Sequence, residues 1–441
     1  MTSPFLQLGY SLLLLLTLFN YNANLIIANL LLVSEKIYTS LWAALAILLA
    51  SFLSTKSLRV NNKMLTLINI YIAVALIALI LGSHGHDLSQ SSYARHIGFA
   101  FFWMVGYIFT SSGLLGDGRI FQRTGLVLIA ISLFATRAAL YHMGESAYYQ
   151  WVIDSIFSHI GSGQISLASL LSEQTVFRFT WPGMDSTRAV MILNMMVPFA
   201  VGGLLCSRST PWRVVAMVCG IQLTLFVIES YSRGGFMILL LILFAFVYVR
   251  LVPGLYAFLM AALLLVAIFV AGDTYLLRLA STLTSVTGQE SVMISESSHR
   301  LLGIPEALQR LSDAPLFGTD AGEVADFVGI DFLYFAGQDG LLLTVLKYVF
   351  LTLPLFGFRN RARALVLAGF HEWAIFYAGY GAYFFSLLIG PTTYAFMLYA
   401  GLAYGLTQSH RACPNPTDHP LPQPSIKSID GAIPATGNVP P

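Results

Sequence analysis

Long apolar stretches recur along the chain between short polar segments, and this pattern predicts membrane-spanning helices. An apolar run of about 20 residues is long enough to cross the roughly 30 Å hydrocarbon layer as a helix. We expect about twelve such spans, near residues 5–33 (with a polar break at 20–24), 39–54, 64–82, 96–112, 121–140, 189–206, 213–229, 235–250, 254–271, 340–357, 364–387 and 391–408. The predicted fold class is therefore an all-α membrane protein with about 12 transmembrane helices.

The composition agrees with this prediction. Only 10% of the 441 residues are charged and 57% are hydrophobic, whereas soluble domains carry roughly 25% charged residues. A net charge of +2, without a basic arm interleaved with aromatic residues, argues against a nucleic-acid partner. The 3 cysteines are too few and too scattered for a disulfide framework or a zinc knuckle. Because no Lys or Arg and no small-residue cleavage site mark the N-terminus, we expect a retained helix there.

The distribution of charge predicts the orientation. Lys and Arg fill alternate loops, at residues 56–63, 119–123, 208–213, 250 and 359–363, and positive loops face the cytoplasm. Both termini are then cytoplasmic, and the opposite side carries two long acidic loops, at about 141–188 and 272–339. Loops of that length are usually functional. We expect one transmembrane domain over 1–410 and a disordered cytoplasmic tail over 411–441, which is rich in Pro, Ser and Gly.

Three stretches on the predicted outer side share one feature, an arginine in or just before the first turn of a helix. They are Asp185-Ser-Thr-Arg188, Tyr231-Ser-Arg233-Gly-Gly and Ser297-Ser-His-Arg300. Backbone N–H groups and the helix dipole favour anions at a helix start, and the guanidinium fork fits phosphate. If the three ends converge, they form an anion site. The alternatives are that each arginine reaches the lipid headgroups or pairs with a nearby acid, as Arg233 would with Glu229.

The segment after Arg300 contains Pro315-Leu-Phe-Gly318 and leads into an apolar run through Gly340. With these residues the chain resembles the O-antigen ligase/polymerase superfamily of lipid-linked glycan transferases. The "YSRGG" of 231–235 resembles the "SRG" helix start of that family. The "STRAVMILNMMVPFA" of 186–200 resembles its helix with an arginine and an asparagine. The resemblance covers about residues 185–360 in order.

This resemblance implies a GT-C-like helical fold and a glycosyltransferase that needs neither a metal nor another cofactor. The absence of any Asp-x-Asp pair agrees with that implication. The implied substrates are undecaprenyl-diphosphate-linked oligosaccharides at the periplasmic face of the bacterial inner membrane, and the implied partners are a flippase and a chain-length regulator. The diphosphate-binding arginines of the family match Arg188, Arg233 and Arg300, and we assign the last two to catalysis.

The chain departs from the ligases of this family in one respect. Ligases carry a histidine about ten residues before the glycine that leads the helix after the large loop, and residues 331–340 contain none. The departure favours a Wzy-type polymerase, with a ligase as the alternative. A transporter or flippase is less favoured, because the charges crowd the outer rim rather than the bilayer midplane.

Transfer to a sugar hydroxyl calls for a general base near the acceptor. We predict Asp331 in that role, because it lies near the position of the missing histidine. The alternative is that Asp331 caps a helix start or pairs with an arginine. The other candidate bases on the outer side are Asp339, Glu296 and Glu229. Arg178, Tyr334 and Asp339 complete the predicted substrate-binding set, in which the ring of Tyr334 stacks on a sugar or belongs to an interfacial aromatic belt.

Overall fold

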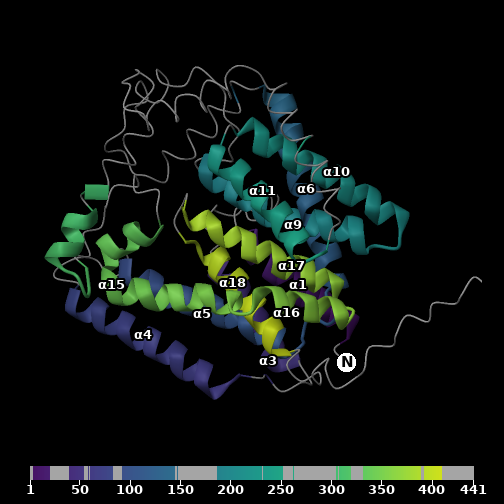
Figure 1. Ribbon diagram of the computed structural model, residues 1–441. Coiled ribbons are helices and arrows are strands. Elements are labelled where there is room, and N and C mark those ends of the chain that lie inside the picture. The colour runs from purple at the N-terminus through teal and green to yellow at the C-terminus, as the bar shows by residue number, and fades with distance from the viewer. Residues whose placement is uncertain are drawn as a thin grey trace, which may run out of the picture.

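The computed structural model describes residues 3–19, 39–53, 60–82, 92–144, 186–230, 232–251, 304–318 (except 306), 331–388 and 392–409, with residues 58, 147 and 262 besides. Across these ranges the chain is helical and forms no strand (Figure 1). The helices are α1 (Pro4–Leu18), α3 (Thr39–Leu53), α4 (Asn62–Gly82), α5 (Ser92–Ser111), α6 (Arg119–Met143), α9 (Ser186–Cys206), α10 (Thr210–Glu229), α11 (Arg233–Tyr248), α15 (Asp331–Thr352), α16 (Phe358–Leu367), α17 (His371–Tyr383) and α18 (Tyr394–Ser409), with the 3₁₀-helices η1 (Leu353–Leu355) and η2 (Phe384–Leu388).

Several of these helices have the length and apolar character of membrane spans. Five are long and apolar enough to cross a membrane: Asn62–Ile80, Arg119–Met143, Ala189–Cys206, Thr210–Glu229 and Asp331–Leu355. Three shorter apolar helices are Pro4–Leu18, Trp42–Leu53 and Gly234–Tyr248. The prediction of an α-helical membrane protein is thus confirmed for the described part of the chain. The expected span at 254–271 and the second half of the expected first span fall outside it.

Two predicted spans have different boundaries in the structure. The stretch predicted as one span over 364–387 is divided at Gly369, which has a left-handed φ of 81°. Before the division lies α16, whose sequence contains three arginines, and after it lies the apolar α17. The helix predicted to begin near 340 begins at Asp331 and is broken at Gly340 instead. Hydropathy missed the break at Gly369, because a glycine inside an apolar stretch does not interrupt it. It missed the segment 331–339 because Gln338 and Asp339 separate that segment from the apolar run that begins at 340.

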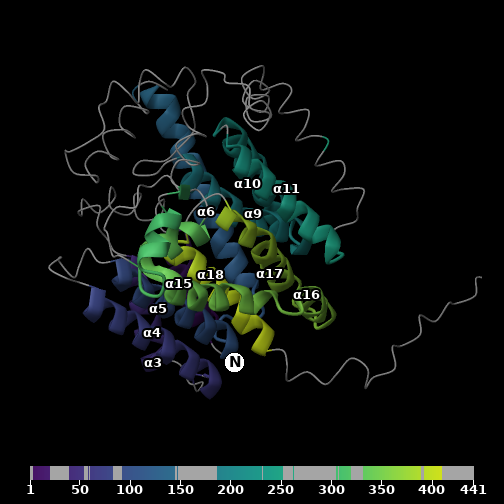
Figure 2. The same cartoon turned by 60° about the vertical axis from the view of Figure 1, so that its left-hand side comes forward.

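The helices divide into two groups with a shared centre. Helices α4, α5 and α15 lie on one side of the bundle and α6, α9, α10 and α11 on the other, with α17 and α18 between them (Figures 1 and 2). Contacts between α5 and α18, α17 and α18, and α17 and α9 join the groups. The starts of α9, α11 and α15 lie toward the same end of the bundle (Figure 1), and the candidate site lies at this end.

Candidate functional site

Helix α15 doubles back on itself at Gly340. The Nζ atom of Lys347 lies 2.6 Å from the Oδ2 atom of Asp331, 16 residues earlier in the sequence. In a straight helix these residues would be separated by about 24 Å along the axis. Gly340 makes the reversal with a φ of 80°, a conformation that costs glycine little because it has no Cβ. The first segment of α15, residues 331–339, therefore lies against the second.

The turn Pro315–Gly318 closes around this break. The N–H groups of Leu341 and Leu342 donate to the carbonyls of Pro315 and Leu316, at 2.9 and 3.3 Å. These donors stand at the start of a helical segment, where no intrahelical acceptor exists. A Cβ at Gly318 would lie 2.2 Å from the carbonyl oxygen of Gln338, so the turn and the break are in direct backbone contact. The turn thus stabilises the reversed path of α15.

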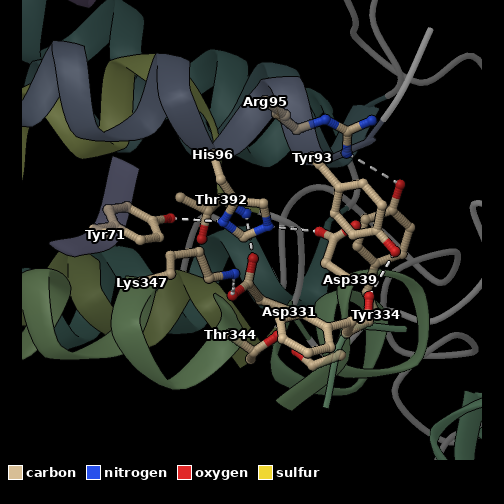
Figure 3. A network of polar contacts seen from close by, with 12 residues as sticks. Tyr71, Tyr93, Arg95, His96, Asp331, Tyr334, Asp339, Thr344, Lys347 and Thr392 are labelled. Carbon is tan, nitrogen blue, oxygen red and sulfur yellow. Dashed lines mark hydrogen bonds and ion pairs between the residues drawn. The ribbon is translucent and has the colours of Figure 1, made fainter. Parts of the chain in front are cut away.

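A buried chain of hydrogen bonds connects α4, α5 and α15 (Figure 3). The hydroxyl of Tyr71 lies 2.6 Å from Nδ1 of His96, and Nε2 of His96 lies 2.7 Å from Oδ2 of Asp339. All three residues are inaccessible to solvent. With a neutral ring, the Nε2–H group of His96 donates to the carboxylate and Tyr71 donates to Nδ1. Buried polar groups in such a chain hold their helices in one arrangement.

A second buried pair lies beside the first. Both carboxylate oxygens of Asp331 are engaged, one by Lys347 and the other by the backbone N–H of Thr392. The Nζ atom of Lys347 also lies 3.3 Å from the ring centroid of Phe335, a cation–π contact. Neither charged side chain of the pair is accessible. The alternative for Asp331 named an arginine as its partner, whereas in the structure the partner is Lys347.

A second cation, Arg95, lies at the edge of this cluster. Nη1 of Arg95 donates to the hydroxyl of Tyr334 at 3.4 Å (Figure 3), and its Cζ lies 5.9 Å from the ring centroid of Phe335. Asp339 has one oxygen, Oδ1, that is buried and has no hydrogen-bond partner in the described part of the chain. The cluster thus contains a guanidinium at its rim and a carboxylate oxygen able to accept a hydrogen bond.

The structure brings together three of the predicted site residues. Asp331, Tyr334 and Asp339 all lie in the first segment of α15. Arg178 and Arg300 fall outside the described residues, as do the side chains of Arg188 and Arg233. Those three residues of α15 therefore have defined surroundings, and the roles predicted for the four arginines stay predictions.

The backbone of α11 begins as the sequence predicts. Its first residue is Arg233, and the hydroxyl of Ser232 accepts the N–H of Gly235 at 3.2 Å as an N-cap. The acid considered as a partner for Arg233 is engaged elsewhere: Oε1 of Glu229 lies 3.0 Å from Nη2 of Arg137. The backbone at the start of α11 is thus capped by Ser232, and the side chain of Arg233 lies outside the described part of the chain.

The first turn of α11 lies against α9 near the start of that helix. A Cβ at Gly235 would lie 1.8 Å from Cγ1 of Val190, so only glycine permits this approach. The amide of Asn194 donates to the carbonyl of Gly235 at 2.8 Å. The predicted anion-binding helix starts, those that carry Arg188 and Arg233, are therefore neighbours. Segment η2 contacts both α11 and α15, and Thr392 shortly after it bonds to Asp331.

Sequence reasoning overlooked the partners of the two aspartates. Tyr71 and His96 are widely separated in the sequence from Asp339, so no local motif connects them. Lys347 had a usable signal, because an ionisable residue inside a predicted span is a functional candidate by default. Lys347 lies inside the span predicted over 340–357, so that rule points to it.

Comparison with known proteins adds no relative: the chain matches no family model, no curated protein and no solved structure. Among the described residues, no group of three or more His, Cys, Asp or Glu side chains is placed to hold a metal ion. The function is therefore argued from the motifs of the chain and from the contacts they make.

Proposed function

We propose that the protein is a polymerase that joins undecaprenyl-diphosphate-linked oligosaccharide repeat units into an exopolysaccharide, capsule or O-antigen, at the outer face of a bacterial inner membrane. The observation that carries the proposal is the contact between Gly235 and Val190, which sets the first turn of α11 against the second turn of α9. Two helix starts that each bear an arginine, with their backbone donors and positive dipole ends, suit a diphosphate.

In this proposal the arginines act on the leaving group. The acceptor hydroxyl forms a new bond to the anomeric carbon of the donor sugar, and the bond from that carbon to the lipid diphosphate breaks. The electron pair leaves with the diphosphate, whose growing negative charge is stabilised by Arg233, Arg188 and Arg300. Fixed positive charge at the place where charge develops lowers the barrier without a metal. Because the start of an apolar helix lies at the membrane surface, an arginine there is at the same level as the diphosphate of a lipid-linked sugar.

For the general base the contacts favour Asp339 over Asp331. Asp331 uses both oxygens in bonds to Lys347 and Thr392, whereas Oδ1 of Asp339 has no partner among the described residues. Since Asp339 is fully buried, the acceptor hydroxyl has to enter between α5 and α15 to reach it. We expect Asp339→Asn to abolish polymer at a normal protein level and Asp331→Asn to retain more activity. The opposite order would return the role of base to Asp331.

The experiment that tests the function is made in a strain that lacks the gene. Wild type, Arg233→Ala and Arg208→Ala are returned on a plasmid, and lipid-linked oligosaccharides and surface glycan are extracted and sized. We expect Arg233→Ala to lower polymer about 100-fold or more, with single repeat units left on the lipid. Arg208 lies exposed beyond the other end of α9, so Arg208→Ala controls for loss of an arginine. Normal polymer from Arg233→Ala, with the protein present in the membrane, would refute the proposal.

One observation favours the ligase alternative. The histidine that ligases carry is absent from 331–340, but α5 supplies His96, which lies 2.7 Å from the residue directly before Gly340. A histidine from another helix thus lies beside the segment 331–339, at Asp339 and not at Asp331, the residue near the position of the family histidine. The same extraction separates the two functions. Long polymer stranded on its lipid carrier in the deletion strain indicates a ligase, and single repeat units indicate a polymerase.

A further inference from the structure

Three arginines gather at the end of α11 that is opposite to Arg233. Arg250 follows the last turn of α11, while Arg359 and Arg363 lie on α16. The guanidinium carbon of Arg359 lies 5.1 Å from the ring centroid of Tyr248, so α16 lies against the end of α11. Residues four apart on a helix share one face. Arg359 and Arg363 therefore point to the same side, toward the end of α11.

Among the described residues, no carboxylate pairs with these three arginines. Nε of Arg359 and Nη2 of Arg363 are buried without a hydrogen-bond partner. Burial, together with the positive charges of Arg359 and Arg250, lowers the pKa of Arg363. Like charges four residues apart destabilise a helix, so the cluster is unfavourable unless an anion joins it.

The neighbouring arginine on the same helix provides a contrast. Nη1 of Arg361 donates to the carbonyl of Leu353 at 3.4 Å and to Oγ1 of Thr407 at 3.3 Å. Arg361 therefore ties α16 to the rest of the bundle. Arg359 and Arg363 instead keep N–H donors without a hydrogen-bond partner among the described residues and lie toward the end of α11. Helix α16 therefore has one arginine that bonds to the bundle and two that have donors left for a ligand.

The backbone of Arg250 is also unusual. It has a φ of 64°, and it is the one residue other than glycine with a positive φ in the described part of the chain. Its N–H donates to the carbonyl of Val247 and that of Leu251 to the carbonyl of Phe246, both at 2.8 Å. This pair of bonds ends a helix with a left-handed residue, a position usually filled by glycine. Strained residues kept in this way are often functional.

We propose that Arg250, Arg359 and Arg363 bind a phosphate group, carried either by the headgroup of an anionic lipid or by a free phosphate compound. Guanidinium forks match the oxygens of phosphate, and several of them surround it with donors. Basic pockets between membrane helices bind lipid headgroups. Phe244 and Tyr248 stack on each other beside the cluster and are 64% and 46% exposed, as expected of a surface that faces lipid. The site lies at the far end of α11 from Arg233 and is separate from the proposed glycan site.

The test uses the full-length protein in detergent micelles. The variant Arg359→Gln/Arg363→Gln is compared with wild type and with Arg208→Gln, which removes an exposed arginine without touching α16. Binding of a fluorescent phosphatidylglycerol is measured, with phosphatidylcholine as the uncharged control, and inorganic phosphate is added as competitor at constant ionic strength. We expect the Kd for phosphatidylglycerol to rise tenfold or more in the double variant, since two charge-assisted hydrogen bonds are lost, and to be unchanged in Arg208→Gln.

The competitor separates the two sources of phosphate. Displacement of the lipid by inorganic phosphate assigns the site to phosphate compounds in general, and resistance to displacement assigns it to a lipid headgroup. Equal binding by wild type and the double variant overturns the proposal. Melting curves without added anion provide a second measurement: the double variant should melt at the same temperature as wild type or higher, because a repulsion is removed. A lower melting temperature would show that these arginines serve the fold, and it overturns the proposal as well.

Discussion

Helix α5 has two interfaces of opposite character. Against α18 it packs through small residues: a Cβ at Gly106 would lie 2.5 Å from the carbonyl oxygen of Leu398, and one at Gly401 would lie 2.0 Å from that of Trp103. Against α15 it places His96 beside a buried aspartate. Helix α5 thus packs against α18 without buried charge and against α15 with buried charge.

The difference between the two interfaces separates contacts that helix packing explains from contacts that packing does not explain. Close approach through small residues is a common way to join helices in a membrane, because lipid supplies no hydrophobic drive between them. Burying an ionisable group between membrane helices costs free energy, and such groups commonly mark functional sites. The contact of α5 with α18 therefore needs no function to explain it, whereas the two buried pairs on α15 do. Three variants test this contrast.

The largest effect is expected from Lys347→Met. It leaves the carboxylate of Asp331 buried without its cation, and removing one partner of a buried pair costs about 3–5 kcal/mol. Unfolding of the purified protein in detergent, followed by intrinsic fluorescence, measures the loss. The double variant Asp331→Asn/Lys347→Met removes both charges and should recover most of the stability. If the single variant is as stable as wild type, the ion pair does not hold the two segments of α15 together.

A smaller loss is expected from Gly401→Ala, at the interface without charge. The new Cβ would meet the backbone of Trp103, and overpacking of this kind costs about 1–3 kcal/mol. The matched control is Gly9→Ala in α1, where the nearest atom to a Cβ is 4.0 Å away, so the better helix propensity of alanine should leave stability unchanged or slightly raised. Both are measured by the same unfolding assay. Equal effects at the two glycines would contradict close packing between α5 and α18.

The smallest effect is expected from Tyr71→Phe, which removes only the hydroxyl next to His96. The loss of one buried hydrogen bond costs about 1 kcal/mol. Tyr10→Phe serves as the control, because the hydroxyl of Tyr10 makes only a long bond of 3.4 Å to the carbonyl of Leu49. Unfolding and glycan length are measured together. A Tyr71→Phe protein of normal stability that makes shortened glycan would assign the hydroxyl to the reaction rather than to the fold.

Much of the helix pattern was predictable from the sequence, and the reasons are local. The predicted spans near 64–82, 121–140 and 213–229 correspond to α4, α6 and α10 within a few residues. Whether a segment can span a membrane depends on the hydropathy of its own consecutive turns, which can be read directly from the sequence. The helix start at Arg233 was predictable for the same reason, since an N-cap depends on residues next to it. The reversal at Gly340 was not, because an apolar run that begins at a glycine does not show that a helical segment precedes it and folds back against it.

The sequence by itself determined the class of protein, the position of Arg188 and Arg233 in the first turns of their helices, and the turn at 315–318. Only the tertiary structure decided which charges meet. It paired Asp331 with Lys347 across a reversed helix and brought His96 from α5 to Asp339, 243 residues away. It also set Gly235 of α11 against α9. Hydrophobic periodicity shows which face of a helix is apolar. A buried ion pair depends instead on how helices far apart in the sequence pack together, and no local sequence pattern predicts that packing.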